Sequence, residues 1–479
     1  MPPPLPLTTI QIIPLLIFLF SLPCFLSNGV HYPTKNQNPI NKNNTVETNM
    51  DPFEQETLFK IMESMSSDRN WRVSNPYPCK PGSSWPGLEC KTNNRGDTHF
   101  HVIRLDFGSP PNTTCKKTAT FPAQIFNLPC LESAFFLHCF TFTRTTLEII
   151  SSSSSTLQQL SLRSNQALVG PVPPQISSLK SLEILTLSQS QLNGKIPVEI
   201  FSLQSLIHLD LSYNSLVGTI PNQMGNLKNL LGLDLSYNSL SGSIPPTIGN
   251  LGLLQKLDLS SNALTGIVPE TIENLKLLVF LALGNNRLKG KSFPQGITKL
   301  VSLQYLLMDG NSMFMSSLPN ELGNLVKLQE LRLGNSGFSG TIPTSISHLM
   351  NLTTLSLENN RLTGEIPAGL SNLSHIYHLN LSRNMLSGVV PFNVGFLKRL
   401  GRNLDLSGNP KLCLNASSQI LDDKKIASTV NICGSSNGYL IQQPPFNKKA
   451  GAAASPSRGF SSLFSFLTLL GILSSIFLV

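Results

Sequence analysis

Residues Leu206–Pro221 read LIHLDLSYNSLVGTIP, and Leu230–Pro245, which begins 24 residues later, reads LLGLDLSYNSLSGSIP. The register of this repeat is set by the position three residues after the last strand leucine, which is Asn214 in the first segment. The position recurs at steps of 24 or 25 residues and holds nine asparagines and two serines. The eleven residues are Asn165, Ser190, Asn214, Asn238, Asn262, Asn286, Asn311, Ser336, Asn360, Asn384 and Asn409. The chain from Leu157 to Asn409 is therefore one continuous array of repeats.

A period in the twenties with leucines at fixed offsets is typical of a leucine-rich-repeat solenoid. Each L-x-L pair predicts a short strand, and the strands of successive coils should form one parallel sheet on the concave face. Turns and short 3-10 pieces should form the convex face of this α/β-type horseshoe or twisted superhelix. One coil leaves two broad faces exposed, so stability depends on stacking.

The asparagine position should stabilise the stack. The Asn214 amide both donates and accepts, so it can satisfy backbone groups of its own and adjacent turns and form a ladder through the stack. Ser190 and Ser336 offer fewer hydrogen bonds, so their coils should be looser.

The chain has 479 residues, of which 13% are charged, with a formal net charge of +9 and eight cysteines. Residues 1–29 have no charged side chain, hold an apolar core and end in small residues before Val30, which resembles a secretory signal peptide. A membrane-anchoring helix is the alternative, disfavoured by Pro14 and Pro23. Secretion predicts oxidised cysteines and N-glycosylation. The acceptor sequons are Asn43, Asn112, Asn351, Asn372, Asn380 and Asn415.

Residues 30–50 are polar and predict a flexible lead-in. Asp51, Pro52 and Glu54 match the N-cap, first-turn proline and capping box of a helix. The apolar face of this helix should comprise Phe53, Leu58, Ile61, Met62 and Met65. Residues 96–156 hold two degenerate repeats, with Cys139 at the ladder position, and lead into the regular repeats at 157–409.

Both ends of the array resemble the caps of plant extracellular leucine-rich repeats. At the N-terminal end, W-x(7)-C-x(5)-W-P-G-L-E-C spans Trp71–Cys90, and at the C-terminal end N-P-K-L-C follows the last repeat. The resemblance implies an N-terminal cap at 51–95 with a Cys79–Cys90 disulfide. It implies a C-terminal cap at 410–434 closed by Cys413–Cys433.

Three further cysteines, Cys115, Cys130 and Cys139, lie in the degenerate repeats. Removal of Cys24 with the signal peptide leaves seven cysteines, so one should stay unpaired. We favour Cys115–Cys139 with Cys130 free, while the other pairings of these three remain open.

The C-terminus predicts a lipid anchor. Residues 435–451 form a polar stalk, and Leu463–Val479 is a run of 17 uncharged apolar or small residues. Small residues, a nine-residue spacer and a terminal apolar tail are the pattern for a glycosylphosphatidylinositol anchor. We expect attachment at Gly451 and removal of residues 452–479, which would place the protein on the outer face of the plasma membrane. A single C-terminal transmembrane helix is the alternative.

From Asp51 to Cys433 the chain resembles plant receptor-like proteins that have leucine-rich repeats and no kinase. Its L-x-G-x-I-P consensus is that of the plant extracellular type. The cap, the cysteine-bearing early coils, Gly170–Pro173 and the anchor tail resemble the Piriformospora indica-insensitive / Too Many Mouths group, although Cys130 adds an odd thiol. The resemblance implies cell-surface recognition or a co-receptor role in development or in the response to microbes. Without kinase motifs, such a protein would signal through a partner receptor kinase.

The strand side chains that do not point inward should form columns on the concave face, where a peptide or protein ligand would bind. The residues expected to bind it are His208, Asp210, Tyr213, Asp234, Tyr237, Lys256, Asp258, Phe280, Tyr305, Leu307, Asp309, Glu330 and Arg332. Phe280, Tyr305 and Leu307 form the one large apolar cluster on this face, and such patches commonly mark interaction sites. The alternative is that these apolar residues arose by sequence drift without a function, or that a loop covers them. Glycosylation of Asn380 would confine ligands to the coils before it.

The sequence favours a protein that is not an enzyme and has no cofactor or metal. Residues i and i+2 lie ~6.6 Å apart along a strand, too far for a triad of His208, Asp210 and Ser212. The aspartate column should stay solvated, and the histidine pairs lack further metal ligands. Spread charge and secretion exclude nucleic acid as a partner.

Two other functions remain open. One is inhibition of a microbial wall-degrading enzyme, as in polygalacturonase-inhibiting proteins, which share these 24-residue repeats but are soluble. The other is a structural wall protein that binds pectin.

Overall fold

The computed structural model describes residues 50–66, 70–80, 87–92, 99–108, 115–150, 156–311, 316–415 and 430–434. The chain divides into two units, Met1–Cys433 and Gly434–Val479, and every described helix and strand lies in the first. The predicted signal peptide, the lead-in except Met50, the stalk, the anchor signal with Gly451, and the sequons at Asn43 and Asn112 lie outside the described residues.

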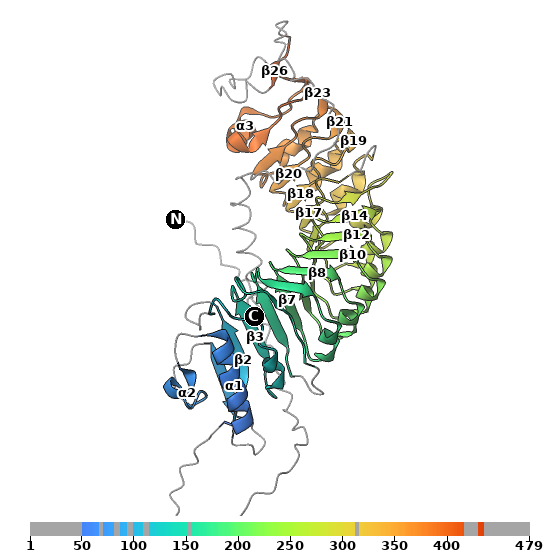
Figure 1. Ribbon diagram of the computed structural model, residues 1–479. Helices are drawn as coiled ribbons and strands as arrows, with labels where there is room; N and C mark the ends of the chain where they lie inside the picture. Colours follow the sequence, from blue (N-terminus) through green and yellow to red (C-terminus); the bar gives the residue numbers. More distant parts are fainter. Residues whose placement is uncertain are drawn as a thin grey trace, which may run out of the picture. The chain divides into compact units, whose positions relative to one another are not determined.

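The predicted solenoid is confirmed: each coil contributes one short strand to a 14-stranded sheet (Figure 1). All neighbours in this sheet pair in parallel except the first two, which are antiparallel. In spatial order the strands are β1 Leu88–Thr92, β2 Phe100–Phe107, β3 Ser133–Leu137, β5 Gln159–Arg163, β7 Ile184–Ser188, β9 His208–Asp210, β11 Gly232–Asp234, β13 Lys256–Asp258, β15 Phe280–Ala282, β17 Tyr305–Leu307, β18 Glu330–Arg332, β20 Thr354–Ser356, β22 His378–Asn380 and β24 Leu404–Asp405.

The opposite face of most coils carries a 3-10 helix, as predicted for the convex side. These helices are η1 Ala123–Asn127, η2 Pro174–Ser178, η3 Val198–Ser202, η4 Asn222–Asn226, η5 Pro246–Asn250, η6 Glu270–Asn274, η7 Gln295–Lys299, η8 Asn320–Asn324, η9 Thr344–His348 and η10 Ala368–Asn372, while η11 Gly401–Asn403 directly precedes β24. The last coil also has an α-helix, α3, at Val394–Leu400. Between the two faces, the repeat leucines form a continuous core with residues such as Leu209, Leu211 and Leu216 buried.

Two further parallel sheets follow the ladder positions and were not predicted. The seven-stranded sheet contains β16 Arg287–Leu288, β14 Ala263–Gly266, β12 Ser239–Ser243, β10 Ser215–Thr219, β8 Gln191–Lys195, β6 Leu168–Pro171 and β4 Thr145–Thr146. The five-stranded sheet contains β19 Ser339–Thr341, β21 Arg361–Gly364, β23 Met385–Val389, β25 Lys411–Leu414 and β26 Asn431–Ile432.

Among the described residues, the seven-stranded sheet ends at β16, and an isolated bridge from Ser317 to Ser339 precedes β21. Residues 312–315, which lie between β16 and this bridge, are outside the described residues.

The ladder itself is confirmed. Asn286 is typical: its Nδ2 donates to the carbonyls of Leu259 and Leu283 (2.9 and 3.1 Å), and its Oδ1 accepts from the Leu264 N–H (3.0 Å). Ser190 donates only to the Ser188 carbonyl, at 3.3 Å. Ser336, however, donates to two carbonyls and accepts from the Asn311 N–H. The prediction that serine coils lose bonds therefore describes Ser190 better than Ser336.

The N-terminal cap begins with α1, Pro52–Met65, and α2, Trp71–Ser74. Asp51 caps α1 as predicted, because its carboxylate accepts from the N–H groups of Phe53 and Glu54. Two details of the predicted helix were wrong. Glu54, predicted as the capping-box residue, is buried and accepts from the Val102 N–H (2.7 Å) beside His101. Phe53, predicted on the apolar face, is 66% exposed, and Phe59 is buried instead.

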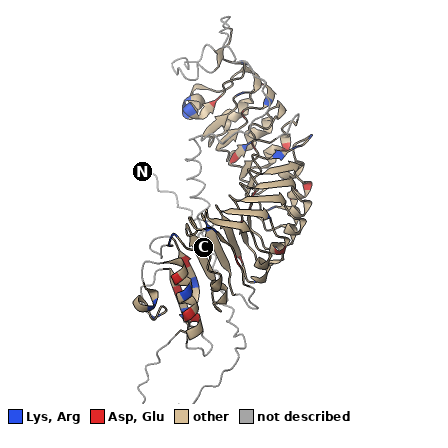
Figure 2. Ribbon diagram, in the orientation of Figure 1, with Lys and Arg blue, Asp and Glu red and all other residues tan. Residues whose placement is uncertain are grey.

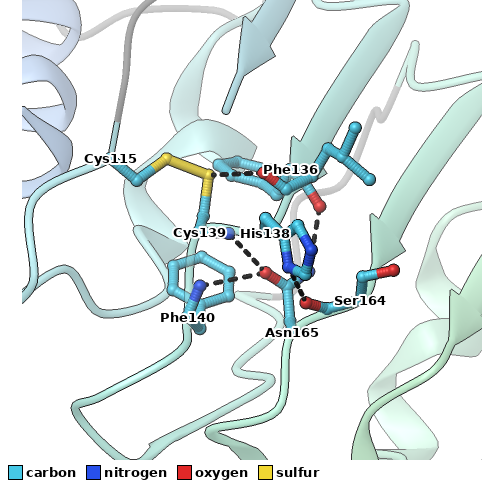
Figure 3. Close-up of a disulfide and its surroundings, with 8 residues drawn as sticks. Cys115, Phe136, His138, Cys139, Phe140, Ser164 and Asn165 are labelled. Carbon is cyan, nitrogen blue, oxygen red and sulfur yellow. Dashed lines mark hydrogen bonds between the residues drawn. A yellow bond between two sulfur atoms is a disulfide. The ribbon is translucent and has the colours of Figure 1, made fainter. Parts of the chain in front are cut away.

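All three predicted disulfides are present: Cys79–Cys90, Cys115–Cys139 and Cys413–Cys433. Cys139 lies where the ladder begins, and its N–H and that of Phe140 donate to Oδ1 of Asn165 (Figure 3). The prediction that Cys130 is free is wrong: Cys130 is disulfide-bonded, and its partner lies outside the described residues. The prediction rested on an odd number of cysteines, seven, which is the number after residue 29, whereas the full sequence has eight.

Charged residues are sparse along the strands of the repeats, whereas α1 carries both signs and α3 carries Lys398 and Arg399 (Figure 2). Within the part of the chain that the structure describes, no helix has the length and apolar character needed to cross a membrane.

Candidate ligand-binding face

Parallel pairing in register aligns equivalent positions of successive coils into two rows on the concave sheet. The first row is Ile184, His208, Gly232, Lys256, Phe280, Tyr305, Glu330, Thr354 and His378. The second row is Thr186, Asp210, Asp234, Asp258, Ala282, Leu307, Arg332, Ser356, Asn380 and Asp405. The leucine between the two points into the core. The predicted columns therefore exist, and most of the predicted ligand-binding residues lie in them.

Asp210, Asp234 and Asp258 of the second row are half-buried and stabilise their own turns. In each case Oδ1 accepts from the N–H and the hydroxyl of the serine two residues later, for example from Ser260 to Asp258 at 3.0 and 2.6 Å. Lys256 donates from Nζ to Oδ2 of Asp234 at 2.9 Å. Burial, and then the neighbouring Asp234 carboxylate, raises the pKa of Asp210 and raises that of Asp258 to about 6. These carboxylates are held close together in a partly dehydrated row, not freely solvated as predicted.

The raised pKa of Asp258 makes stability depend on pH. Because its folded-state pKa exceeds its ordinary value of 3.8, ionised Asp258 destabilises the fold, by an amount that grows as pH rises from about 4 through 6. We expect Asp258→Asn to raise the free energy of unfolding by about 2 kcal/mol at pH 7.5 and to have little effect below pH 4. Asn380 already makes the same two bonds with Ser382.

Denaturant unfolding at several pH values measures this difference. The variant creates the sequon Asn-Leu-Ser, so both proteins should come from the bacterial periplasm, where disulfides form without N-glycosylation. A stability difference that does not change with pH would contradict the assignment.

The charged residues beside this row have their own environments. Burial lowers the pKa of Lys256, but the attraction of Asp234, Asp258 and Asp210 outweighs it, so that the net pKa is raised. Burial and then Lys256 lower the pKa of His208, whose Nδ1 lies against the backbone of Gly232. A side chain at Gly232 would collide with it, since an added Cβ would lie 2.6 Å from Nδ1.

Tyr213 and Tyr237 lie just beyond the strands, at the position before the ladder asparagine. Both have left-handed backbone conformations, with φ of 53° and 51°, which cost non-glycine residues about 1–2 kcal/mol. Their rings stack with centroids 4.1 Å apart and planes 10° from parallel. The residues are 37% and 45% exposed, so the pair adds little to the core. Burial, and then Tyr237, raises the pKa of Tyr213, with Asp234 and Asp258 adding to the shift.

The predicted apolar cluster is only partly available. Phe280 is 6% exposed, because Lys256 lies over its ring at 5.9 Å and Tyr305 lies 6.0 Å away on the next coil. Its prediction as an exposed contact is therefore wrong. Tyr305 and Leu307 are half-buried, and the Tyr305 hydroxyl donates to Gln329 at 3.1 Å. Burial, and then Glu330, raises the pKa of Tyr305.

The later coils carry charges of both signs. Arg332 donates to Glu330 within the same strand, so these two predicted residues neutralise one another. Burial raises the pKa of Asp309. Burial, and then Arg332, lowers the pKa of His378. No single sign of charge dominates this end of the face.

The described sequons differ in access. Asn372 and Asn415 are exposed. Asn351 is exposed too, and its Nδ2 donates to the Val326 carbonyl at 2.9 Å. Asn380 lies on the concave face but is half-buried, and its Oδ1 accepts from Ser382. Glycosylation of these residues stays a prediction.

The spacing argument against a catalytic triad was wrong for one pair. Strand β9 ends at Asp210, the chain bends, and the Ser212 hydroxyl then donates to Asp210 at 2.6 Å. The same bond joins Ser382 to the Asn380 amide, so it is a turn motif of the repeat. Among the described residues, no group of three or more His, Cys, Asp or Glu side chains is arranged to hold a metal ion.

A row of exposed apolar residues on the flank was missed. Before each concave strand, two buried leucines are separated by a two-residue link. In five successive coils this link holds one large exposed apolar residue. These residues, the flank stripe, are Leu253, Leu277, Val301, Val326 and Met350, each 43–56% exposed. The links of the three preceding coils are polar: Lys180-Ser181, Gln204-Ser205 and Lys228-Asn229. The change from polar to apolar within this two-residue link is visible in the sequence and could have been found there.

Leucine-rich-repeat family models match residues 205–227, 229–251, 252–313, 327–349 and 351–373. Among curated proteins of Arabidopsis thaliana, Receptor like protein 29 is 61% identical over 153 residues, which is 31% of this chain and 32% of that protein. Protein TOO MANY MOUTHS is 37% identical over 140 residues (28% and 27%), and Piriformospora indica-insensitive protein 2 is 34% identical over 149 residues (30% and 34%). The matches thus span about a third of the length of these relatives.

Solved structures show the same fold. The ectodomain of the Arabidopsis receptor kinase HAESA, in complex with an IDA peptide hormone, is 27% identical with a TM-score of 0.59 and covers 76% of this chain and 58% of that one. The plant peptide hormone receptor RGFR1 in complex with RGF2 is 33% identical with a TM-score of 0.54, covering 62% and 50%. Together with the repeat consensus and the curated relatives, these likenesses support a place for the chain in the plant leucine-rich-repeat receptor-like protein group.

Proposed function

We propose that this protein is a cell-surface receptor component that binds a peptide or protein ligand on its concave face. The observation that carries the proposal is the in-register concave sheet, which arranges polar and aromatic side chains in straight rows. Rows spaced ~4.8 Å apart suit an extended peptide that crosses several coils. The two neighbouring structures that hold peptide hormones add support.

The second part of the proposal is a partner on the membrane. The ligand-bound protein would signal through a receptor kinase in development or in the response to microbes, and a glycosylphosphatidylinositol anchor would hold it at the outer face of the plasma membrane. The flank stripe supports a protein partner, because it places one exposed apolar residue on each of five successive coils, and exposed apolar patches commonly mark protein contacts. It lies beside the concave face, so a partner could dock there while a ligand occupies the sheet.

Glycans placed on the concave face test the ligand site. Thr186→Asn and Thr354→Asn each create an Asn-Leu-Ser sequon on a concave strand, near opposite ends of the regular repeats. Gln175→Asn creates Asn-Ile-Ser on the exposed surface of η2 and serves as the matched control. The proteins, secreted from plant cells, are titrated with peptides selected from a displayed random library on the wild type. We expect at least one concave glycan to weaken binding tenfold or more and the control glycan to leave it unchanged. Equal binding to all three variants would contradict a concave site.

A matched pair of valines tests the partner. Val301→Asp with Val326→Asp places charge on the flank stripe, and Val198→Asp changes a valine of similar exposure on η3. Purification from native membranes should recover a receptor kinase with the wild type and the control but not with the double variant. Recovery of the same kinase with the double variant would remove the flank stripe from the proposal.

A further inference from the structure

The stacked pair Tyr213 and Tyr237 has an open end. At the same repeat position the next coil has Ser261, which shares the left-handed backbone conformation (φ 54°) but has a small side chain. The 4.1 Å between the two ring centroids shows that residues at this position on successive coils are spaced for stacking. The space over Ser261, beside the ring of Tyr237, therefore suits one more flat group.

The electrostatics beside this space favour a cation. Asp234 and Asp258 are close enough to the ring pair to disfavour the tyrosinate form of Tyr213. Asp234 is paired with Lys256 through Oδ2. The hydrogen bonds that Asp258 makes with described residues all use Oδ1, so Oδ2 remains as an acceptor. The second aspartate thus leaves negative charge next to an aromatic face.

We propose that this place binds the guanidinium of an arginine in an extended peptide ligand, stacked on Tyr237 over Ser261 and hydrogen-bonded to Asp258. A guanidinium is flat, carries a permanent charge and stacks on aromatic rings while it donates to a carboxylate, whereas an ammonium does not have the flat shape. Exposed aromatic side chains of this kind are common binding hot spots. The inference rests on the proposed function, since it assigns one ligand residue to the concave face.

Two variants test the site from opposite directions. Tyr237→Ala removes the stacking surface. Ser261→Tyr fills the space over Ser261 with a third ring, and tyrosine already adopts this backbone conformation at Tyr213 and Tyr237. Asn335→Tyr introduces the same tyrosine at the same repeat position of a distant coil, in an exposed residue (φ 55°), and is the control.

Displayed random peptides selected on the wild-type protein serve as the probe. We expect arginine to be enriched at one position, and replacement of that arginine by the neutral, flat citrulline to weaken binding to the wild type at least tenfold. Tyr237→Ala and Ser261→Tyr should each weaken the arginine peptide about tenfold, and citrulline replacement should cost these variants threefold or less. Asn335→Tyr should match the wild type.

The outcomes separate this inference from the proposed function. Suppose that concave glycans block the peptides, but that the peptides lack arginine or bind Ser261→Tyr as tightly as the wild type. This result would overturn the arginine site and leave a concave ligand face. Peptides that no concave glycan blocks overturn both.

Discussion

Replacement of Asn286 by alanine is expected to lower the free energy of unfolding by about 3 kcal/mol or more. The side chain is 7% exposed, and its amide joins two coils: Nδ2 donates to Leu259 of the preceding coil and to Leu283 and Gly284 of its own, and Oδ1 accepts from the Leu264 N–H of the preceding coil. Alanine leaves that N–H buried without its partner, at about 1–3 kcal/mol, and removes the donors to the carbonyls as well. Denaturant unfolding followed by circular dichroism measures the loss.

The control for this substitution is Asn226→Ala, an exposed asparagine at the end of η4. Surface substitutions of this kind usually change stability by less than about 0.5 kcal/mol. Amide exchange adds a local measurement, since only Asn286→Ala should expose the Leu264 N–H. If both variants unfold at the same denaturant concentration, the ladder does not stabilise the stack as its geometry indicates.

Gly249→Ala is expected to lower stability by about 2 kcal/mol although it adds a single methyl group. Gly249 lies in η5, and a Cβ there would be 2.3 Å from the carbonyl oxygen of Thr271 in the next coil. Because that oxygen belongs to the backbone, two coils must separate, and overpacking of this kind costs about 1–3 kcal/mol. The entropy lost from the unfolded chain offsets only about 0.4–1 kcal/mol of this.

The same coil provides the control for Gly249. Gly252 is exposed, and an added Cβ would meet nothing within 4 Å. Gly252→Ala should therefore leave stability unchanged or slightly increased. Thermal unfolding of the two variants separates backbone collision from the general effect of glycine replacement, and equal midpoints would show that η5 and η6 can move apart at little cost.

The sequence predicted the features that repeat and missed those that depend on neighbouring coils. Period and leucine spacing were enough for the concave sheet, the asparagine ladder and the 3-10 turns, because each follows from one coil copied along the chain. The second sheet was missed because strands such as β10, which reads SLVGT, bury a single apolar residue and depend on stacking for their pairing.

The candidate site shows the same division. That Lys256, Asp258 and Phe280 lie on one face follows from repeat position, but the burial of Phe280 depends on the length of Lys256 and the ring of Tyr305. The stack of Tyr213 on Tyr237 requires the left-handed backbone before the ladder, which a single repeat does not reveal. Pairing of Cys130 was missed because counting cysteines cannot place them in space.

The second sheet bears on how the solenoid deforms. From β8 to β14, where both sheets are present, a change of curvature must stretch hydrogen bonds on two sides, in the concave sheet and in the second sheet. These coils therefore behave as a laminated beam, in which two bonded layers resist bending more than either layer would alone.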